Sequence, residues 1–166
     1  MAQITLIGIP KRVAEEGCGP LLSISVIGEI CGQFIMKFKT GDTASISKAI
    51  TDDDIQKFAD ASGDHNPLHL DDEFARSTRF GRRIAHGMLS ASLISAVIAN
   101  QLPGQGSIYL GQTLKFVAPV FPGDTITARV TVISIRDDKP VMKLKTVCVN
   151  QHGKVVITGE ATVLVY

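Results

Sequence analysis

A long apolar segment near the middle of the chain limits the folds that are open to it. The segment HGMLSASLISAVIANQLPG, residues 86–104, is almost uniformly apolar or small from Met88 to Ala99 and stops at Pro103 and Gly104. This pattern predicts a helix that is buried on every side. The chain has 166 residues, of which 45% are apolar, and this suffices for one domain with a core. Such a domain can bury the helix only if other elements wrap around it.

The second half of the chain has a strand pattern and supplies the wrapping element. Residues 126–132 alternate apolar side chains with polar or charged ones, as in a half-buried strand. Turn residues separate the strands, so strands that follow one another are expected to pair antiparallel. With a further strand near residues 42–49, the expected fold class is α+β, with one antiparallel sheet that curls around the long helix. The later strands are expected within residues 106–120, 124–135, 140–150 and 154–166, with turns at 136–140 and 150–154.

Two shorter helices are expected between the first strand and the apolar segment. In TDDDIQKFADASG, residues 51–63, Thr51 is a suitable N-cap, the first turn is acidic, and Gly63 is a stop. The segment DDEFARSTRFG, residues 71–81, is expected to form a shorter helix that Gly81 closes. The residues between these helices, 64–70, therefore form a turn.

Charge and cysteine content exclude several classes of protein. The net charge is +1, from 17 basic and 16 acidic residues, so the broad basic surface typical of nucleic-acid binding is not expected. Three widely spaced cysteines, Cys18, Cys31 and Cys148, favour free thiols in a reducing compartment over a disulfide framework. No apolar run approaches the roughly 18 to 20 residues that a membrane span needs. We therefore expect a cytoplasmic protein that binds neither nucleic acid nor membrane.

The first 35 residues stand apart from the expected domain. Residues 21–36 resemble a weak secretory signal, but Glu29 interrupts them and no small-residue cleavage site follows, so export is not expected. A natural domain start occurs at Met36, in MKFKTGDTASI. Residues 1–35 are accordingly an N-terminal extension of uncertain order or the product of a misassigned start, and the sequence leaves both open. Residues 36–166 form the expected domain.

The turn SGDHNPLHL, residues 62–70, concentrates groups that can transfer protons. Asp64 and His69 lie five positions apart, and Pro67 redirects the chain between them. On a straight helix this spacing would place them on different faces, whereas a turn can aim both side chains into one pocket. A carboxylate beside an imidazole can act as base and as acid near neutral pH, because each stabilises the charged form of the other. The alternative is that Asp64 only caps the turn.

Three motifs at matching intervals resemble the MaoC-like hydratases and dehydratases of the hotdog fold. They are SGDHNPLHLDDEFA, RIAHGMLSASL and GSIYLGQTLKFVAPVFPGDTI, within a likeness that runs from about residue 40 to the C-terminus. The first motif alone is moderately specific, and the three together are strong. The likeness is greatest to the (R)-specific enoyl-CoA hydratases of fatty-acid and polyhydroxyalkanoate metabolism. It implies a sheet wrapped around the long helix, two subunits paired into a continuous sheet, and an acyl-CoA thioester bound near the subunit boundary.

By position, this resemblance implies roles for five residues. Asp64 and His69 match the catalytic Asp and His, and Asn66 matches the Asn between them. Gly87 matches the residue whose backbone N–H faces the thioester carbonyl. Ser95 matches a polar helix position that lines the site, although a serine in an apolar helix commonly bonds the carbonyl one turn back.

These roles suit the chemistry of hydration. Syn addition of water to a trans-2-enoyl thioester needs a base to take a water proton and an acid to protonate C2, and which of Asp64 and His69 acts first stays open. The enolate oxygen needs donors, and Gly87 lies just before the apolar helix, where unpaired N–H groups and the positive dipole end point outward. Asn66 is expected to orient the turn or the water, and His86 to fix the loop.

The remaining histidines do not form an obvious metal site. His65 occupies a position that is often apolar in the family, and we expect it to be exposed or to serve only in packing. A site made of His65, His69 and His86 lacks a clear carboxylate or cysteine partner set. No metal and no cofactor are therefore expected.

Three arginines and two serines near the apolar helix are further candidates for functional roles. Arg79, Arg82 and Arg83 are candidates for contacts with CoA phosphates or an acidic carrier protein, because arginine binds phosphate in a bidentate fork. A solvated cluster in a loop is an equal alternative. Ser90 and Ser92 are not nucleophile candidates, because the G-x-S-x-G motif is absent.

The leading hypothesis is a lyase that reversibly hydrates trans-2-enoyl-CoA to (R)-3-hydroxyacyl-CoA without metal or cofactor. The alternatives are a 3-hydroxyacyl carrier-protein dehydratase or other acyl-CoA dehydratase, a hotdog thioesterase, and a non-catalytic acyl-binding subunit. The expected partners are an acyl-CoA thioester and a second copy of the chain in a homodimer or higher oligomer. The sequence does not predict the acyl chain length.

Overall fold

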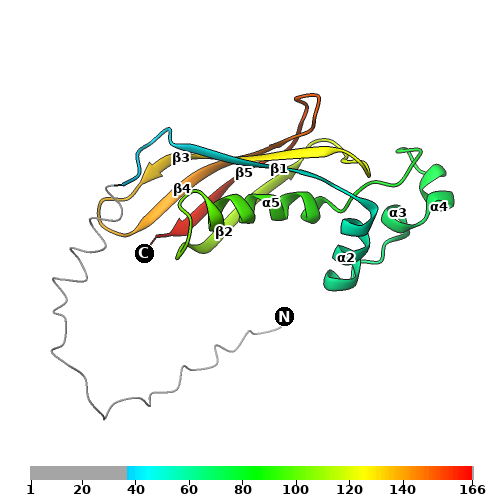
Figure 1. Ribbon diagram of the computed structural model, residues 1–166, viewed down its shortest axis with the longest axis horizontal. Helices are drawn as coiled ribbons and strands as arrows, with labels where there is room; N and C mark the ends of the chain where they lie inside the picture. Colours follow the sequence, from blue (N-terminus) through cyan, green and yellow to red (C-terminus); the bar gives the residue numbers. More distant parts are fainter. Residues whose placement is uncertain (1–36, 166) are drawn as a thin grey trace, which may run out of the picture.

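The computed structural model describes residues 37–165 as a single antiparallel sheet with helices on one side of it (Figure 1). The strand order is β1-β3-β4-β5-β2, which leaves β1 and β2 at the two edges. The predicted extension, residues 1–35, lies outside the described residues, as do Cys18 and Cys31. The strands are β1 (Thr43–Ala49), β2 (Ile108–Phe116), β3 (Thr125–Ile135), β4 (Val141–Val149) and β5 (Val155–Leu164).

The predicted turns join the strands as expected. β3 pairs with β4 and β4 with β5, both antiparallel, and Gly153 closes the second turn by donating its N–H to the Asn150 carbonyl at 2.9 Å. Gly153 has a φ of 74°, a conformation that glycine adopts without steric cost. The edge strands pair across long intervals of sequence, β1 with β3 and β2 with β5. The predicted sheet is thus confirmed.

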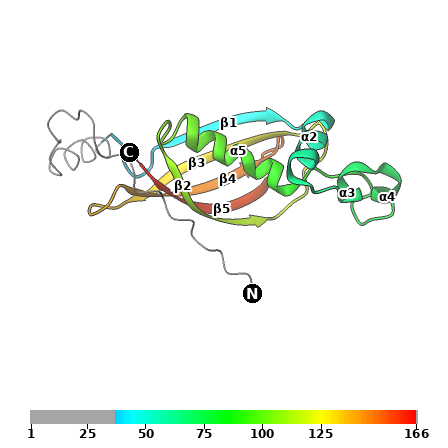
Figure 2. The same cartoon turned by 90° about the horizontal axis from the view of Figure 1, so that it is seen from below.

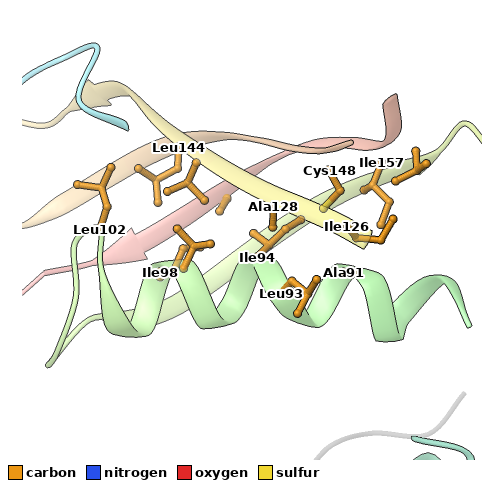
Figure 3. Packing of buried hydrophobic residues seen from close by; sticks show 14 of the residues in the cluster. Ala91, Leu93, Ile94, Ile98, Leu102, Ile126, Ala128, Leu144, Cys148 and Ile157 are labelled. Atoms are coloured by element: carbon orange, nitrogen blue, oxygen red, sulfur yellow. The ribbon is translucent and has the colours of Figure 1, made fainter. Parts of the chain in front are cut away.

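The apolar segment forms α5 (Gly87–Asn100), which runs along one face of the sheet (Figure 2). Ile94 and Ile98 of α5 point toward Ala128, Leu144 and Cys148 of the sheet (Figure 3), and all five are at most 2% exposed. Burying an Ile or Leu side chain contributes about 1.5–3 kcal/mol, so this contact holds the two layers together.

The prediction that α5 is buried on every side was wrong for the described residues. Met88 is 55% exposed, and Ser92, Ser95 and Ala99 are exposed as well. The physical reason is that one five-stranded sheet covers a single side of the helix. No helix among residues 37–165 is long and apolar enough to cross a membrane.

Helix α2 (Asp52–Ser62) begins and ends where the sequence predicts. The Thr51 side chain accepts from the Asp54 N–H at 3.1 Å, and the Asp54 carboxylate accepts from the Thr51 N–H at 3.0 Å, which is a capping box. Gly63 ends the helix with a φ of 76° and donates its N–H to the Ala59 carbonyl.

The helix predicted over residues 71–81 is shorter than expected. It is α4 (Asp72–Arg76), because the hydroxyls of Ser77 and Thr78 donate to the carbonyls of Phe74 and Ala75, both at 2.7 Å. Such side-chain bonds compete with the N–H groups that would continue the helix.

A single helical turn not foreseen as a helix, α3 (Pro67–Leu70), precedes α4. Both views place α2, α3 and α4 together beyond the N-terminal end of α5 (Figures 1 and 2).

Candidate active site

A cavity of about 530 Å³ lies where α2, α3 and the start of α5 meet the sheet, within the size range of small-molecule pockets. Its wall is mostly apolar and includes Phe80, Phe116 and Val117. Asp64, His69 and Gly87 all line it, so the structure brings three of the predicted site residues together.

The turn after α2 positions Asp64. Its backbone N–H bonds the Ser62 hydroxyl at 3.2 Å, and its carboxylate accepts from the Asn66 N–H at 3.3 Å. Asp64 is exposed, as is its neighbour His65, which does not line the cavity. The placement of His65 agrees with its expected role as a bystander.

Helix α3 positions His69. Asn66 is its N-cap, accepting from the Leu68 N–H at 3.0 Å, and Pro67 occupies the first turn, where its missing N–H costs nothing. Asn66 therefore orients the turn in this structure. His69 is 9% exposed, and its Nδ1 lies 2.8 Å from the Ile84 carbonyl. Because a carbonyl only accepts, Nδ1 carries the proton and Nε2 is the basic nitrogen of neutral His69.

A second buried imidazole, His86, stands against the first. Its ring centroid is 3.9 Å from that of His69, with an angle of 36° between the ring planes. The ring centroid of Phe58 is 5.0 Å from that of His86. His86 is 2% exposed, and its Nε2–H donates to the Asp64 carbonyl at 2.9 Å. This bond ties the turn that carries Asp64 to the start of α5, in line with the expected role of His86 in fixing the loop.

These side chains are also the candidate metal ligands among the described residues. Ligand atoms of Asp64, His69 and His86 lie within 4.8 Å of one another, so the structure supplies the carboxylate that the sequence did not suggest, and it leaves His65 out. Nδ1 of His69 and Nε2 of His86 already bond backbone carbonyls, so each imidazole has one nitrogen left for a proton or a ligand. The absence of a metal stays a prediction.

Gly87 is the first residue of α5. Its N-cap residue, His86, forms no side-chain cap bond, and the Leu89 N–H donates to the His86 carbonyl at 3.1 Å. The N–H groups of Gly87 and Met88 therefore stay available to an anion at the positive end of the helix dipole. A Cβ at Gly87 would lie 2.8 Å from the Phe116 ring. A side chain at this position would therefore displace the Phe116 ring, which is 51% exposed and lies on the cavity wall.

The three predicted phosphate-binding arginines do not form a cluster. Arg79 is exposed and lines the cavity. Arg82 stacks on the Phe121 ring at 3.8 Å from its centroid. The guanidinium of Arg83 binds Asp52 at 2.9 Å and Asp72 at 2.8 Å, and its role as a phosphate contact stays a prediction. These carboxylates raise the pKa of Arg83 and commit it to joining α2 and α4.

Ser95 is not brought to the cavity of the single chain. It is exposed on α5 and is absent from the cavity wall, so its role stays a prediction. Ser90, rejected as a nucleophile, does line the cavity, and it is fully buried. The sequence did contain a signal for Ser90, because a residue one turn into the helix that follows His86 and Gly87 lies near the same end of that helix.

Comparison with known proteins identifies the family of this chain. A sequence model of the MaoC like domain matches residues 36–155. An (R)-specific enoyl-CoA hydratase from Rhodospirillum rubrum is 52% identical over 127 residues, which cover 76% of this chain and 88% of that protein. A mitochondrial 3-hydroxyacyl-[acyl-carrier-protein] dehydratase from Arabidopsis thaliana is 38% identical over 159 residues, which cover 94% of this chain and 92% of that protein.

A solved structure has the same architecture. An (R)-hydratase from Aeromonas caviae involved in PHA biosynthesis superposes with a TM-score of 0.76 at 49% identity, covering 78% of this chain and 98% of that one. The predicted hotdog fold is confirmed. From its domain match, its relatives and its fold, the chain belongs to the MaoC-like family.

Proposed function

We propose that the chain is a hydro-lyase that reversibly adds water to trans-2-enoyl-CoA to give (R)-3-hydroxyacyl-CoA. The convergence of Asp64 and the Nε2 side of His69 on one cavity at the N-terminal end of α5 carries this proposal. The name of the Rhodospirillum rubrum relative, at 52% identity, supports it.

In the proposed reaction, one water is held between Asp64 and His69. Nε2 of His69 takes a proton from this water while the water oxygen bonds to C3 of the substrate, and the electron pair of the double bond moves to an enolate. The Asp64 carboxylate stabilises the resulting imidazolium. The proton then passes to C2, so the elements of one water are added. Delivery from the side that holds both groups gives syn addition.

The start of α5 would stabilise the enolate. The Gly87 N–H and the helix dipole offer a donor and a positive field where the thioester oxygen becomes negative. The reaction changes no oxidation state, and we propose that it proceeds without metal or cofactor. Arg79, at the cavity and exposed, is the candidate contact for the CoA phosphates.

We propose that the working unit is a homodimer joined through the edge strand β2. Ile108 and Leu110 of β2 are 46% and 53% exposed, and Phe116 and Val117 at its end are 51% and 46% exposed. An edge strand with apolar side chains is ready to pair with a second copy. Phe116 and Val117 also line the cavity, so the cavity would lie near the interface. The predicted role of Ser95 depends on such a partner. We also propose that the protein is located in the cytoplasm.

The experiment is hydration of crotonyl-CoA by the full-length protein, followed as loss of the enoyl-thioester absorbance, with chiral analysis of the product. Formation of (R)-3-hydroxybutyryl-CoA supports the proposal. Release of free CoA thiol would instead indicate a thioesterase, and binding without turnover would indicate a non-catalytic subunit.

A carrier-protein dehydratase is the second candidate. The observation in its favour is the Arabidopsis thaliana relative, whose similarity covers 94% of this chain. Comparing kcat/KM for crotonyl-CoA and for the same acyl group on acyl carrier protein distinguishes the two. A preference of tenfold or more for one carrier, which is about 1.4 kcal/mol, decides between them.

A further inference from the structure

Two buried polar atoms of the cavity wall have no hydrogen-bond partner: Nδ1 of His86 and Oγ of Ser90. They are the two such side-chain atoms among residues 37–165. Ser90 is 0% exposed and His86 is 2% exposed, and both line the cavity. A buried polar group without a partner costs about 1–3 kcal/mol, so two neighbouring ones in an otherwise paired fold call for an explanation.

The two atoms are chemically complementary. The Asp64 carbonyl accepts from Nε2 of His86 and so fixes the proton there, which leaves Nδ1 as an acceptor. The hydroxyl of Ser90 is a donor that can turn about its Cα–Cβ bond. The residues stand four apart at the start of α5, and the Ser90 backbone N–H bonds the His86 carbonyl at 3.4 Å. Both side chains line the same cavity at the start of α5.

We propose that Ser90 is a positioning residue whose hydroxyl donates to Nδ1 of His86, directly or through one buried water. The bond completes a chain from Ser90 through His86 to the Asp64 carbonyl, and it fixes the orientation of the His86 ring with its Nε2–H on that carbonyl. The turn that carries the catalytic carboxylate is thereby fixed from behind. This inference rests on the proposed hydration.

The orientation of the His86 ring matters because of its neighbour. In the proposed reaction His69 takes up a proton while its ring lies 3.9 Å from that of His86. A His86 ring held by bonds at both nitrogens keeps the packing surface of His69 and the Asp64 turn in place. The other titratable or charged groups on the cavity are Asp64 and Arg79, and the strands contribute none to its wall.

The test is Ser90→Ala in the full-length protein, with Ser92→Ala as the matched control. Ser92 is on the same helix but outside the cavity, and its hydroxyl donates to the Leu89 carbonyl at 2.6 Å. Ser90→Ala is expected to lower kcat roughly 3- to 10-fold with KM unchanged, the effect of one neutral hydrogen bond. Ser90→Thr, which keeps the hydroxyl, should recover most of the lost kcat, and Ser92→Ala should match the wild type.

A spectroscopic measurement gives a second readout that does not depend on activity. Ring ¹⁵N shifts of His86 should show the Nε2–H form in the wild type, with a change at Nδ1 in Ser90→Ala and none in Ser92→Ala. Unchanged Nδ1 shifts, equal kcat losses in both alanine variants, or no recovery in Ser90→Thr would overturn the inference. If the wild-type protein does not hydrate enoyl-CoA, the proposed function is wrong. The ¹⁵N shifts still show whether the Ser90 hydroxyl bonds Nδ1 of His86.

Discussion

The imidazoles of His69 and His86 stack 3.9 Å apart and carry their protons on opposite nitrogens. His69 donates from Nδ1 to the Ile84 carbonyl, whereas His86 donates from Nε2 to the Asp64 carbonyl. Each bond leaves one basic nitrogen, and the basic nitrogen of His86 is buried away from solvent. The backbone thus leaves different nitrogens free on two like side chains: Nε2 of His69, which suits the proposed proton transfer, and Nδ1 of His86, whose Nε2 is tied to the turn.

Removal of either member of the proposed catalytic pair should abolish most of the activity without unfolding the protein. Asp64→Asn and His69→Ala are each expected to lower kcat by about 10²- to 10⁴-fold, the usual contribution of a general acid or base. Crotonyl-CoA hydration measures this, and thermal unfolding checks the fold. His65→Ala is the control, because His65 is exposed and outside the cavity. Wild-type turnover in either catalytic variant would contradict the assignment.

Substitution of Gly87 should impair the site through Phe116. In Gly87→Ala, the new Cβ would lie 2.8 Å from the Phe116 ring and push it or the first turn of α5 aside. Displacement of an oxyanion donor by about 1 Å can cost on the order of 10²-fold in rate. The kcat of Gly87→Ala should recover in part when Phe116→Leu is added. If the double variant is no better than the single one, the ring is not the cause.

The two arginines Arg79 and Arg83 should separate binding from stability. Arg79→Ala is expected to raise KM for the CoA substrate and leave the melting temperature unchanged, because its guanidinium is exposed at the cavity. Arg83→Ala should lower the free energy of unfolding by about 1 kcal/mol, through loss of its bonds to Asp52 and Asp72. Enoyl-CoA kinetics and urea unfolding on both variants measure the difference, and a KM effect in Arg83→Ala alone would reverse the assignment.

The capping box of α2 should make stability depend on acid pH. Bonds from the Thr51 backbone, then the Lys48 side chain, lower the pKa of Asp54 from 3.8 to about 2. A carboxyl with a lower pKa in the folded state stabilises the fold above its unfolded pKa, and this stabilisation is lost as pH falls from about 4 to about 2. Asp54→Asn should therefore destabilise the protein at pH 7, and the difference from wild type should shrink across that window.

The control for this pH dependence is Asp53→Asn. Asp53 pairs with Lys57 on the exposed side of α2 and takes no part in the cap. Exposed ion pairs contribute little to stability, so Asp53→Asn should show no loss of stability that disappears between about pH 4 and about pH 2. An equal loss in both variants would show general charge effects instead of the cap.

Cys148 should be unreactive in the folded protein. It is 0% exposed, and burial raises the pKa of its thiol to about 12, so the reactive thiolate is scarce. In a variant with Cys18→Ser and Cys31→Ser, a thiol reagent should label no cysteine under native conditions and one after unfolding. Rapid native labelling would contradict the packing of Cys148 against α5.

The sequence by itself predicted the strands, α2 and α5, and it proposed Asp64 and His69 as the catalytic pair, whereas α3 and the early end of α4 were not foreseen. Periodicity predicts the strands and α5, because alternation and apolar runs reflect local burial, and caps at Thr51 and Gly63 predict the limits of α2. The D-x-N-P-x-H motif places Asp64 and His69 on one short turn, so their proximity needs no knowledge of distant contacts.

Only the tertiary structure decided what the other polar residues do. Arg83 is held by Asp52 and Asp72, and His86 is fixed by a carbonyl 22 residues earlier in the chain. Ser90 faces the cavity while Ser95, on the same helix, does not. Periodicity records how deeply a side chain is buried but not which partner from another segment meets it. Those partners become defined only when α2, α3 and α5 pack together.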